Sequence, residues 1–171
     1  TMANVAENIR SNPPSITADK IRSMRASLTG QVCARGEPGY DEARTIWNAM
    51  IDRLPGVVVR CTSAADVVGA VRCANAHDLD IAVRGGVHNI AGNAVCQGGM
   101  LIDLSPMNTV SVDPASKTVR VGGGATWGQV DAATHEHGLA VPCGIISTTG
   151  VGGLTLGGGI GHLTRGYGLT M

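Results

Sequence analysis

The sequence RGGVHN, residues 84–89, is the most informative motif for the fold expected of this chain. It follows IAV, residues 81–83, a short apolar run that predicts a buried strand. Two glycines in succession after a strand let several backbone N–H groups turn toward one point, which suits phosphate oxygens. A second stretch, GVGGLTLGGGIG at residues 150–161, has apolar residues between its glycines and suits contact with an apolar ring. The two stretches therefore predict two loops that cradle one ligand.

Glycine is the unusual feature of the composition. The 171 residues include 25 glycines, about twice the usual share, and most of them follow residue 84. Valine, isoleucine and leucine are interspersed among them, which argues against disorder. No G-x-G-x-x-G joins the first strand to its helix, and no G-x-x-x-x-G-K-[ST] occurs. A Rossmann site and a mononucleotide-hydrolysing loop are therefore not supported.

The spacing of apolar residues predicts two helices ahead of the first strand. The first begins after Thr17, its expected N-cap, and the second runs from about residue 41 to the Pro-Gly pair at 55–56. A strand is expected at residues 57–61. Ser63 and Asp66 then resemble a capping box, which opens a helix to about residue 77. Together with the next strand this makes a βαβ unit, for which parallel strands are expected.

The remaining elements expected are a strand at residues 100–104, a hairpin of residues 110–112 and 118–121, and a helix from about 126 to 137 that ends at Gly138. The fold class is α+β, in two lobes that meet where the glycine loops lie. Residues 1–56 are expected to form a helical lead-in, and residues 57–171 the ligand-binding domain. No closing strands follow the second loop, so we expect the second lobe to be incomplete and the chain to be part of a longer protein.

Charge and cysteine content exclude several classes of function. Lys plus Arg number 13, as do Asp plus Glu, and no basic run occurs, so a nucleic-acid partner is not expected. The chain start carries no apolar signal core, and no apolar run is long enough for a membrane span. The five cysteines are odd in number and form no CxxC pair. We therefore expect no metal site and no complete disulfide framework, and a reducing cytoplasm as the compartment.

Several ordered motifs together resemble one protein family. They are RGGVHN, IDLS at residues 102–105, TGVGGL at 149–154 with its following glycines, and ARTIWN at 43–48. In this order they are similar to the N-terminal FAD-binding half of berberine-bridge-enzyme-like FAD-linked oxidases, within the vanillyl-alcohol-oxidase superfamily. The similarity covers nearly the whole chain. It implies a two-lobed FAD-binding domain of the PCMH type, with the substrate-binding half and the catalytic base beyond Met171.

The resemblance also implies which residues hold the cofactor. In the family, the histidine of the first loop bonds the flavin 8α-methyl, and His88 occupies that place. Bicovalent members carry a cysteine four residues before the second glycine motif, where this chain has Ile146; a second link through Cys143, three residues earlier, is the less favoured alternative. Many plant members have histidine where Leu154 stands. FAD contacts are expected from Arg84, Gly85, Gly86, Val87, His88, Asn89, Leu104, Ser105, Cys143, Gly144, Ile146, Thr148, Thr149, Gly150, Gly152, Gly153, Gly157, Gly158 and Gly161.

The activity implied by the resemblance is oxidation of a small organic substrate at a C–OH or C–N carbon. The substrate would give a hydride to covalently bound flavin, and O₂ would then take the electrons. Thr149 matches a family position that gates oxygen, but a threonine leaves the electron acceptor open. The expected partners are the substrate, O₂ and the remainder of the same chain or a complementary fragment.

Alternative interpretations stay open at this point. A reductase that uses NADPH on the same fold and a non-catalytic flavin- or nucleotide-binding module both fit a glycine cradle. A lone histidine in a turn is most often structural; the glycines before His88 and the second loop favour the tether instead. Arg84 is expected to support the first loop or a phosphate, and His162 to reach the flavin or substrate side or remain in solvent. Gly86 and Gly152 are expected to have no room for a Cβ.

Overall fold

The first lobe is built on a four-stranded sheet in the order β1-β2-β4-β3. The computed structural model describes residues 16–170. The expectation that the chain start has no apolar signal core concerns residues outside this range. The strands are β1 (Gln31–Ala34), β2 (Val57–Arg60), β3 (Ile81–Arg84) and β4 (Met100–Asp103). β2, β4 and β3 run parallel and β1 is antiparallel to β2. The predicted strands β2, β3 and β4 are confirmed. β2 and β3 run parallel as expected of a βαβ unit, but they do not pair with each other because β4 lies between them.

Helices cover both faces of this sheet because its central strands are apolar on both sides. α1 (Ala18–Ser27) and α3 (Ala64–Ala76) pack on one face, over Val57, Val59 and Ile102. α2 (Tyr40–Arg44) packs on the other, over Val58 and Leu101. The first and third helices begin where predicted, and the side chain of Ser63 accepts a hydrogen bond from the amide of Asp66.

The second predicted helix is wrong beyond Arg44. The carbonyl groups at the end of α2 are hydrogen-bonded by the side chain of Arg84. Its Nη1 donates to the carbonyl oxygens of Ala43 and, at 2.8 Å, of Thr45. A further helical turn would need those carbonyls for its own N–H groups. The chain instead continues along the first glycine loop, and Met50 is left 93% exposed. Strand β1, which follows α1, is an element that no pattern in the sequence indicated.

The second lobe places a hairpin against a helix. Strands β5 (Val110–Asp113) and β6 (Thr118–Val121) pair antiparallel, and α4 (Trp127–His135) packs on β5. The predicted hairpin and helix are confirmed, and Gly138 has the positive φ of +64° expected just past a helix end. Two short helices, α5 (Val151–Leu156) and α6 (Thr164–Tyr167), complete the lobe.

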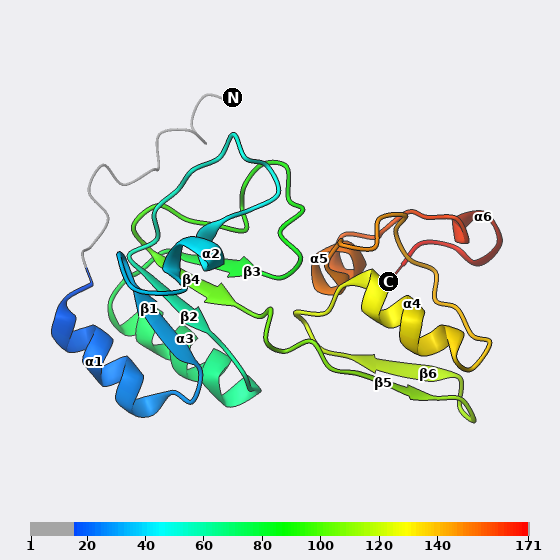
Figure 1. Ribbon diagram of the computed structural model, residues 1–171, viewed down its shortest axis with the longest axis horizontal. Helices are drawn as coiled ribbons and strands as arrows, with labels where there is room; N and C mark the ends of the chain where they lie inside the picture. The colour runs from blue at the N-terminus through cyan, green and yellow to red at the C-terminus, as the bar shows by residue number, and fades with distance from the viewer. Residues whose placement is uncertain (1–15, 171) are drawn as a thin grey trace.

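The lobes lie side by side, and the chain crosses from the first to the second between β4 and β5; after β6 it returns to this crossing before it enters α4 of the second lobe (Figure 1). The segment after β6 is in direct backbone contact with the crossing segment: a Cβ would lie 1.7 Å from the carbonyl oxygen of Leu104 if placed on Gly124, and 2.1 Å from that of Met107 if placed on Gly122. These close approaches explain why residues 122 and 124 are glycines. Within residues 16–170, no helix combines the length and hydrophobicity that a bilayer crossing requires.

Candidate cofactor site

The two glycine loops predicted from the sequence meet backbone to backbone. A Cβ on Gly86 would lie 2.1 Å from the backbone nitrogen of Gly150, and a Cβ on Gly150 would lie 2.3 Å from that of Gly86. The expectation for Gly86 is confirmed, although the space is filled by the other loop. Gly152 is less crowded than expected, since its Cβ would meet only the carbonyl oxygen of Gly123, at 3.2 Å. The lobes are therefore joined at the point where the loops face each other.

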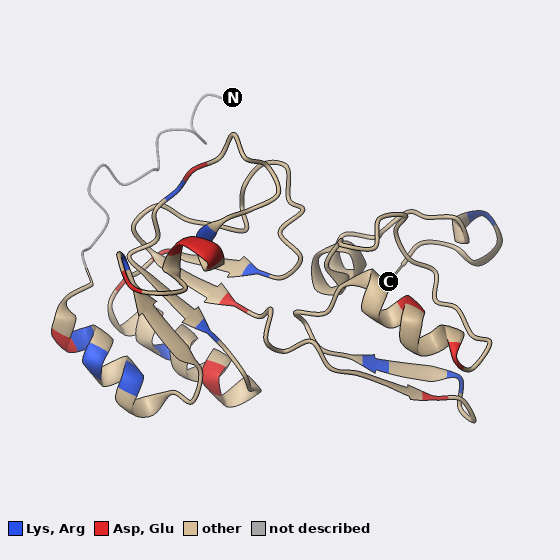
Figure 2. Ribbon diagram, in the orientation of Figure 1, with Lys and Arg blue, Asp and Glu red and all other residues tan. Residues whose placement is uncertain are grey.

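A cavity of about 580 Å³ opens beside this contact, a size typical of small-molecule and cofactor sites. None of the described residues that line it is charged, and Figure 2 shows α5, which forms one wall, without charge of either sign. Ten of the residues predicted to bind a cofactor line it: Gly85, Gly86, Val87, His88, Asn89, Leu104, Thr149, Gly150, Gly152 and Gly153.

Other predicted residues are not in the cavity lining: Arg84, Ser105, Cys143, Gly144, Ile146, Thr148, Gly157, Gly158 and Gly161. Six lining residues were not among the predicted contacts: Val83, Asn93, Ala94, Gly123, Leu154 and Leu156. The glycine run at residues 122–124 was the available signal for Gly123. No comparable pattern marks Asn93 or Ala94, which reach the cavity because the chain after the first loop folds back over the sheet.

The first loop presents unpaired backbone donors. Within residues 16–170, no acceptor is found for the N–H groups of residues 85–89, and the same is true of Gly152 and Gly153 in the first turn of α5. Such groups normally have a partner in a folded protein, and successive free N–H groups form an anion-binding concavity. The pairing of these donors with an uncharged, largely apolar wall fits a ligand that has both phosphate groups and a flat ring system. The residues present therefore fit a flavin nucleotide.

Val87 gives the first loop an unusual backbone conformation. Its φ is +56°, in the left-handed region that β-branched residues avoid. The conformation is held by a hydrogen bond of 3.2 Å that its carbonyl oxygen accepts from the amide of Trp47. Strained residues of this kind persist where the surrounding structure determines them, often at functional sites. Here the strain turns the following residue, His88, toward the second lobe.

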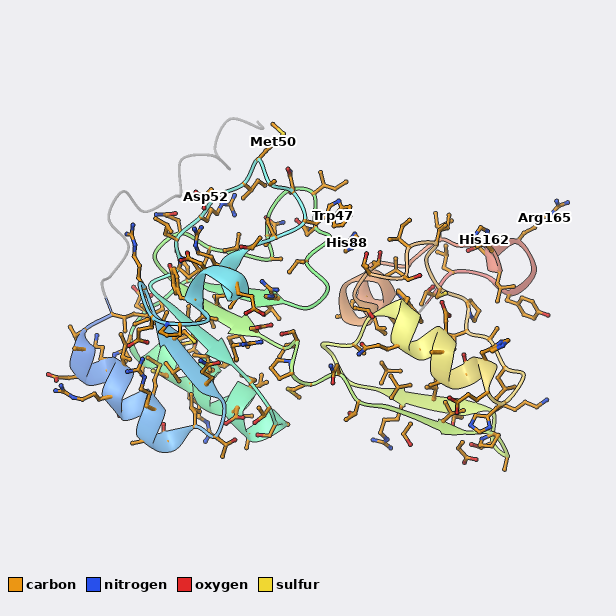
Figure 3. All side chains as sticks on the ribbon, in the orientation of Figure 1. Trp47, Met50, Asp52, His88, His162 and Arg165 are labelled. Atoms are coloured by element: carbon orange, nitrogen blue, oxygen red, sulfur yellow. The ribbon has the colours of Figure 1, made fainter. Side chains whose placement is uncertain are left out.

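His88 is fixed from two sides at the edge of the cavity. Its Nε2 lies 3.0 Å from Oγ1 of Thr148, across the interface between the lobes. Its ring stacks on the indole of Trp47, with centroids 4.7 Å apart and planes 15° from parallel. Figure 3 shows this pair together on the side of the first lobe that faces the second. His162 lies exposed in the second lobe and does not line the cavity.

Arg84 supports the loop rather than lining the cavity. Besides its bonds to the end of α2, its Nε lies 3.4 Å from the carboxylate of Asp103, which is 1% exposed. Arg60 of β2 is paired with Asp103 from the other side of β4, and its Nε lies 3.3 Å from the second oxygen of that carboxylate. Burial lowers the pKa of Arg84, and the neighbouring carboxylate opposes this shift. The row of three side chains ties together the carboxyl ends of the parallel strands, where the first loop begins.

Cys143 lies in a different environment from His88. Its Sγ is 3.3 Å from the carbonyl oxygen of Gly144 and 3.8 Å from the carboxylate of Asp131. Burial raises the pKa of the Cys143 thiol, and the negative charge of Asp131 raises it further. A raised pKa disfavours the thiolate, which is the nucleophilic form of cysteine. Ile146, at the position where bicovalent relatives have cysteine, is exposed and also outside the cavity lining.

Comparison with known proteins places this site in a family. Residues 55–171 match the FAD binding domain family. The chain is 38% identical to the FAD-linked oxidoreductase YgaK of Bacillus subtilis, over 85% of this chain and 32% of that protein. It is also 38% identical to (R)-6-hydroxynicotine oxidase of Paenarthrobacter nicotinovorans, over 84% of this chain and 31% of that protein.

Solved structures agree with the sequence matches. The crystal structure of 6-hydroxy-D-nicotine oxidase from Arthrobacter nicotinovorans superposes with a TM-score of 0.83 at 38% identity, covering 84% of this chain and 32% of that one. BBE-like 1 of Physcomitrella patens superposes with a TM-score of 0.82 at 29% identity, covering 88% of this chain and 33% of that one. The chain thus spans about a third of the length of these proteins. It belongs to the FAD-binding-domain family of berberine-bridge-enzyme-like FAD-linked oxidoreductases.

Proposed function

We propose that the protein holds FAD in the cavity between the two glycine loops and is bonded to it covalently through His88. The free N–H groups of residues 85–89 would bind the pyrophosphate, and the apolar wall of α5 would lie against a ring. The observation that supports the tether best is the placement of His88. A strained residue before it, a stacked indole and a hydroxyl partner hold one imidazole at the cavity edge.

The contacts of His88 suggest which nitrogen forms the bond. Nε2 is engaged by the hydroxyl of Thr148, whereas Nδ1 has no hydrogen-bond partner within residues 16–170. We therefore propose Nδ1 as the attachment atom. The raised pKa of the Cys143 thiol supports a single link over the double link of bicovalent relatives.

We propose that the full-length protein oxidises a small organic substrate at a C–OH or C–N carbon. Bound FAD would accept a hydride from the substrate, and O₂ would take the electrons afterwards. This chain would contribute binding and orientation of the cofactor and exclusion of water from one side of the ring. Relatives that carry the name oxidase, such as (R)-6-hydroxynicotine oxidase and chitooligosaccharide oxidase, support an oxidase over a reductase.

The base that takes the substrate proton is not evident in this cavity. Among the described residues that line it, the polar side chains are those of His88, Asn89, Asn93 and Thr149. Amides and hydroxyls are poor bases near neutral pH, and His88 is assigned to the tether. We propose that the base lies in the part of the relatives' length that this chain does not span.

The tether is tested by acid precipitation of the full-length protein. The parent should retain yellow colour and flavin fluorescence in the denatured pellet, whereas His88→Ala should release all of its flavin into the supernatant. His137→Ala is the matched control, because His137 is exposed on the second lobe and outside the cavity lining. Flavin that stays bound in His88→Ala, or a parent that releases its flavin, would contradict the assignment. Bleaching of the flavin by NADPH alone would favour a reductase instead.

A further inference from the structure

Trp47 occupies an unusual position for a tryptophan. Its side chain is 66% exposed, so it contributes little to the cores of either lobe. The one aromatic neighbour of its indole within residues 16–170 is the imidazole of His88. Figure 3 shows the two side chains at the edge of the first lobe, between the segment that follows α2 and the first glycine loop. Within residues 16–170, this large apolar side chain packs on a single ring rather than in a core, so core packing does not explain its position.

Three sets of contacts fix the backbone of this segment to the first loop. Arg84 donates to the carbonyls that end α2. The amide of Trp47 donates to the carbonyl oxygen of Val87 at 3.2 Å. Nδ2 of Asn48 donates to the carbonyl oxygen of Ile90 at 2.9 Å. None of these bonds involves the indole ring. They should therefore hold the backbone of residue 47 beside His88 even when the tryptophan is replaced.

We propose that Trp47 is a positioning residue for the covalent attachment of FAD to His88. This inference rests on the proposed function of His88. An imidazole turns about two side-chain torsions, and a hydrogen bond at Nε2 alone leaves the plane of the ring free to rotate about that contact. The indole lies nearly parallel to the imidazole and fixes its plane. With Thr148 at one nitrogen and Trp47 on one face, Nδ1 is held in a single direction.

Orientation matters because the attachment is a bond-forming reaction within the complex. In the proposed attachment, Nδ1 of His88 would bond to the 8α carbon of the flavin, while one C–H bond of that carbon and the imidazole N–H bond would break. The electron pair and the two protons would go to the flavin, and O₂ would serve as the oxidant that takes them up as H₂O₂. The rate of such a step depends steeply on how well the attacking atom is aimed.

The test follows covalent attachment in time. Full-length apoprotein is mixed with FAD, and samples are acid-quenched and read by flavin fluorescence in a denaturing gel, while total bound FAD is measured separately. Trp47→Ala should bind as much FAD as the parent but attach it roughly three- to tenfold more slowly, the factor expected from a ring stack of ordinary strength. Trp47→Phe, which keeps a flat ring, should recover most of the rate. Met50→Ala, three residues away and making no ring stack, should behave as the parent.

The outcomes separate this inference from the proposed function. Attachment at the parental rate in Trp47→Ala would overturn the inference while leaving the tether intact. A loss of total FAD in proportion to covalent FAD would also overturn it, because it would show a general structural role. Failure of Trp47→Phe to recover the rate would do the same. A parent without covalent flavin would overturn the tether and the inference together.

Discussion

At the level of single residues, the cofactor site depends on glycines, which have no side chain. The loops approach so closely at Gly86 and Gly150 that neither has space for a methyl group. Gly153 lies in the same cradle and lines the same cavity, yet a Cβ there would meet no protein atom within 4 Å. The glycines of one motif therefore serve two purposes: some let the lobes join, and others leave space for the ligand.

Substitution of Gly86 and of Gly153 should distinguish the joining of the lobes from the binding of the ligand. Gly86→Ala should lower the free energy of unfolding by about 1–3 kcal/mol even without FAD, because its Cβ would force two backbone segments apart. Gly153→Ala should leave the apoprotein as stable as the parent or slightly more so, since alanine favours helix, and should weaken FAD binding instead. Urea unfolding of the apoproteins and FAD titration would measure both effects. Equal stability of the Gly86→Ala and parent apoproteins would contradict the close approach.

At the scale of elements, the beginning of α3 is anchored by a buried carboxylate. Asp66 is 2% exposed and accepts hydrogen bonds from the amides of Thr62 and Thr29 at 3.0 and 2.8 Å, and from both hydroxyls. Burial raises the pKa of Asp66, but these hydrogen bonds together outweigh burial and hold the pKa well below its usual value. The carboxylate thereby joins the turn after α1 to the turn before α3. It is the acidic residue of the predicted capping box, in a different role.

This anchor should make stability depend on pH. Because the pKa of Asp66 is lower in the folded than in the unfolded protein, its stabilisation is fully present above the unfolded value of about 3.9 and is lost as the pH falls below it. Asp66→Asn should cost about 2–3 kcal/mol at pH 7 and should flatten the loss of stability below pH 4. Thr29→Val, which removes one hydroxyl donor but keeps the amide, should cost less. A parental pH profile in Asp66→Asn, measured by urea unfolding, would contradict this account.

At the scale of the whole molecule, the cavity is a property of two lobes and belongs to neither alone. Its walls come from the end of β3 and the first loop on one side and from α5 on the other. Among residues 16–170, the polar side chains that line it are one imidazole, two amides and one hydroxyl, and the rest of the lining is backbone and apolar side chains. Such a site can bind and orient a cofactor, but its described lining includes no carboxylate or phenol that could serve as a base.

We therefore expect residues 1–171 alone to bind FAD without turning over substrate. The segment, loaded with FAD and mixed anaerobically with a panel of alcohols and amines, should show no substrate-dependent bleaching, because proton removal would lack a positioned base. Dithionite should bleach it fully, which controls for the presence of redox-active flavin. Bleaching by a substrate at an enzymatic rate would show that a base lies within these residues. His162 and Tyr167, exposed in the second lobe, would then be the first to replace.

Features that depend on neighbouring residues could be predicted from the sequence. The hairpin turn, the N-cap of α3, the glycine after α4 and the glycine-rich character of both loops all follow from local backbone preferences. The family motifs identified the cofactor class and most of the residues that line the cavity. Each of these signals lies within a few positions of the structure that it specifies.

Contacts that join distant segments became evident only from the three-dimensional structure. Arg84 ends α2 by binding carbonyls some forty positions earlier, β4 inserts between β2 and β3, and Trp47 stacks on His88. The contact of Gly86 with Gly150 likewise joins residues more than sixty positions apart. Helical periodicity past Arg44 was a real pattern, but hydrogen bonds and packing from outside the segment override local propensity. Such partners are set by how the lobes pack against each other, which no local stretch of sequence records.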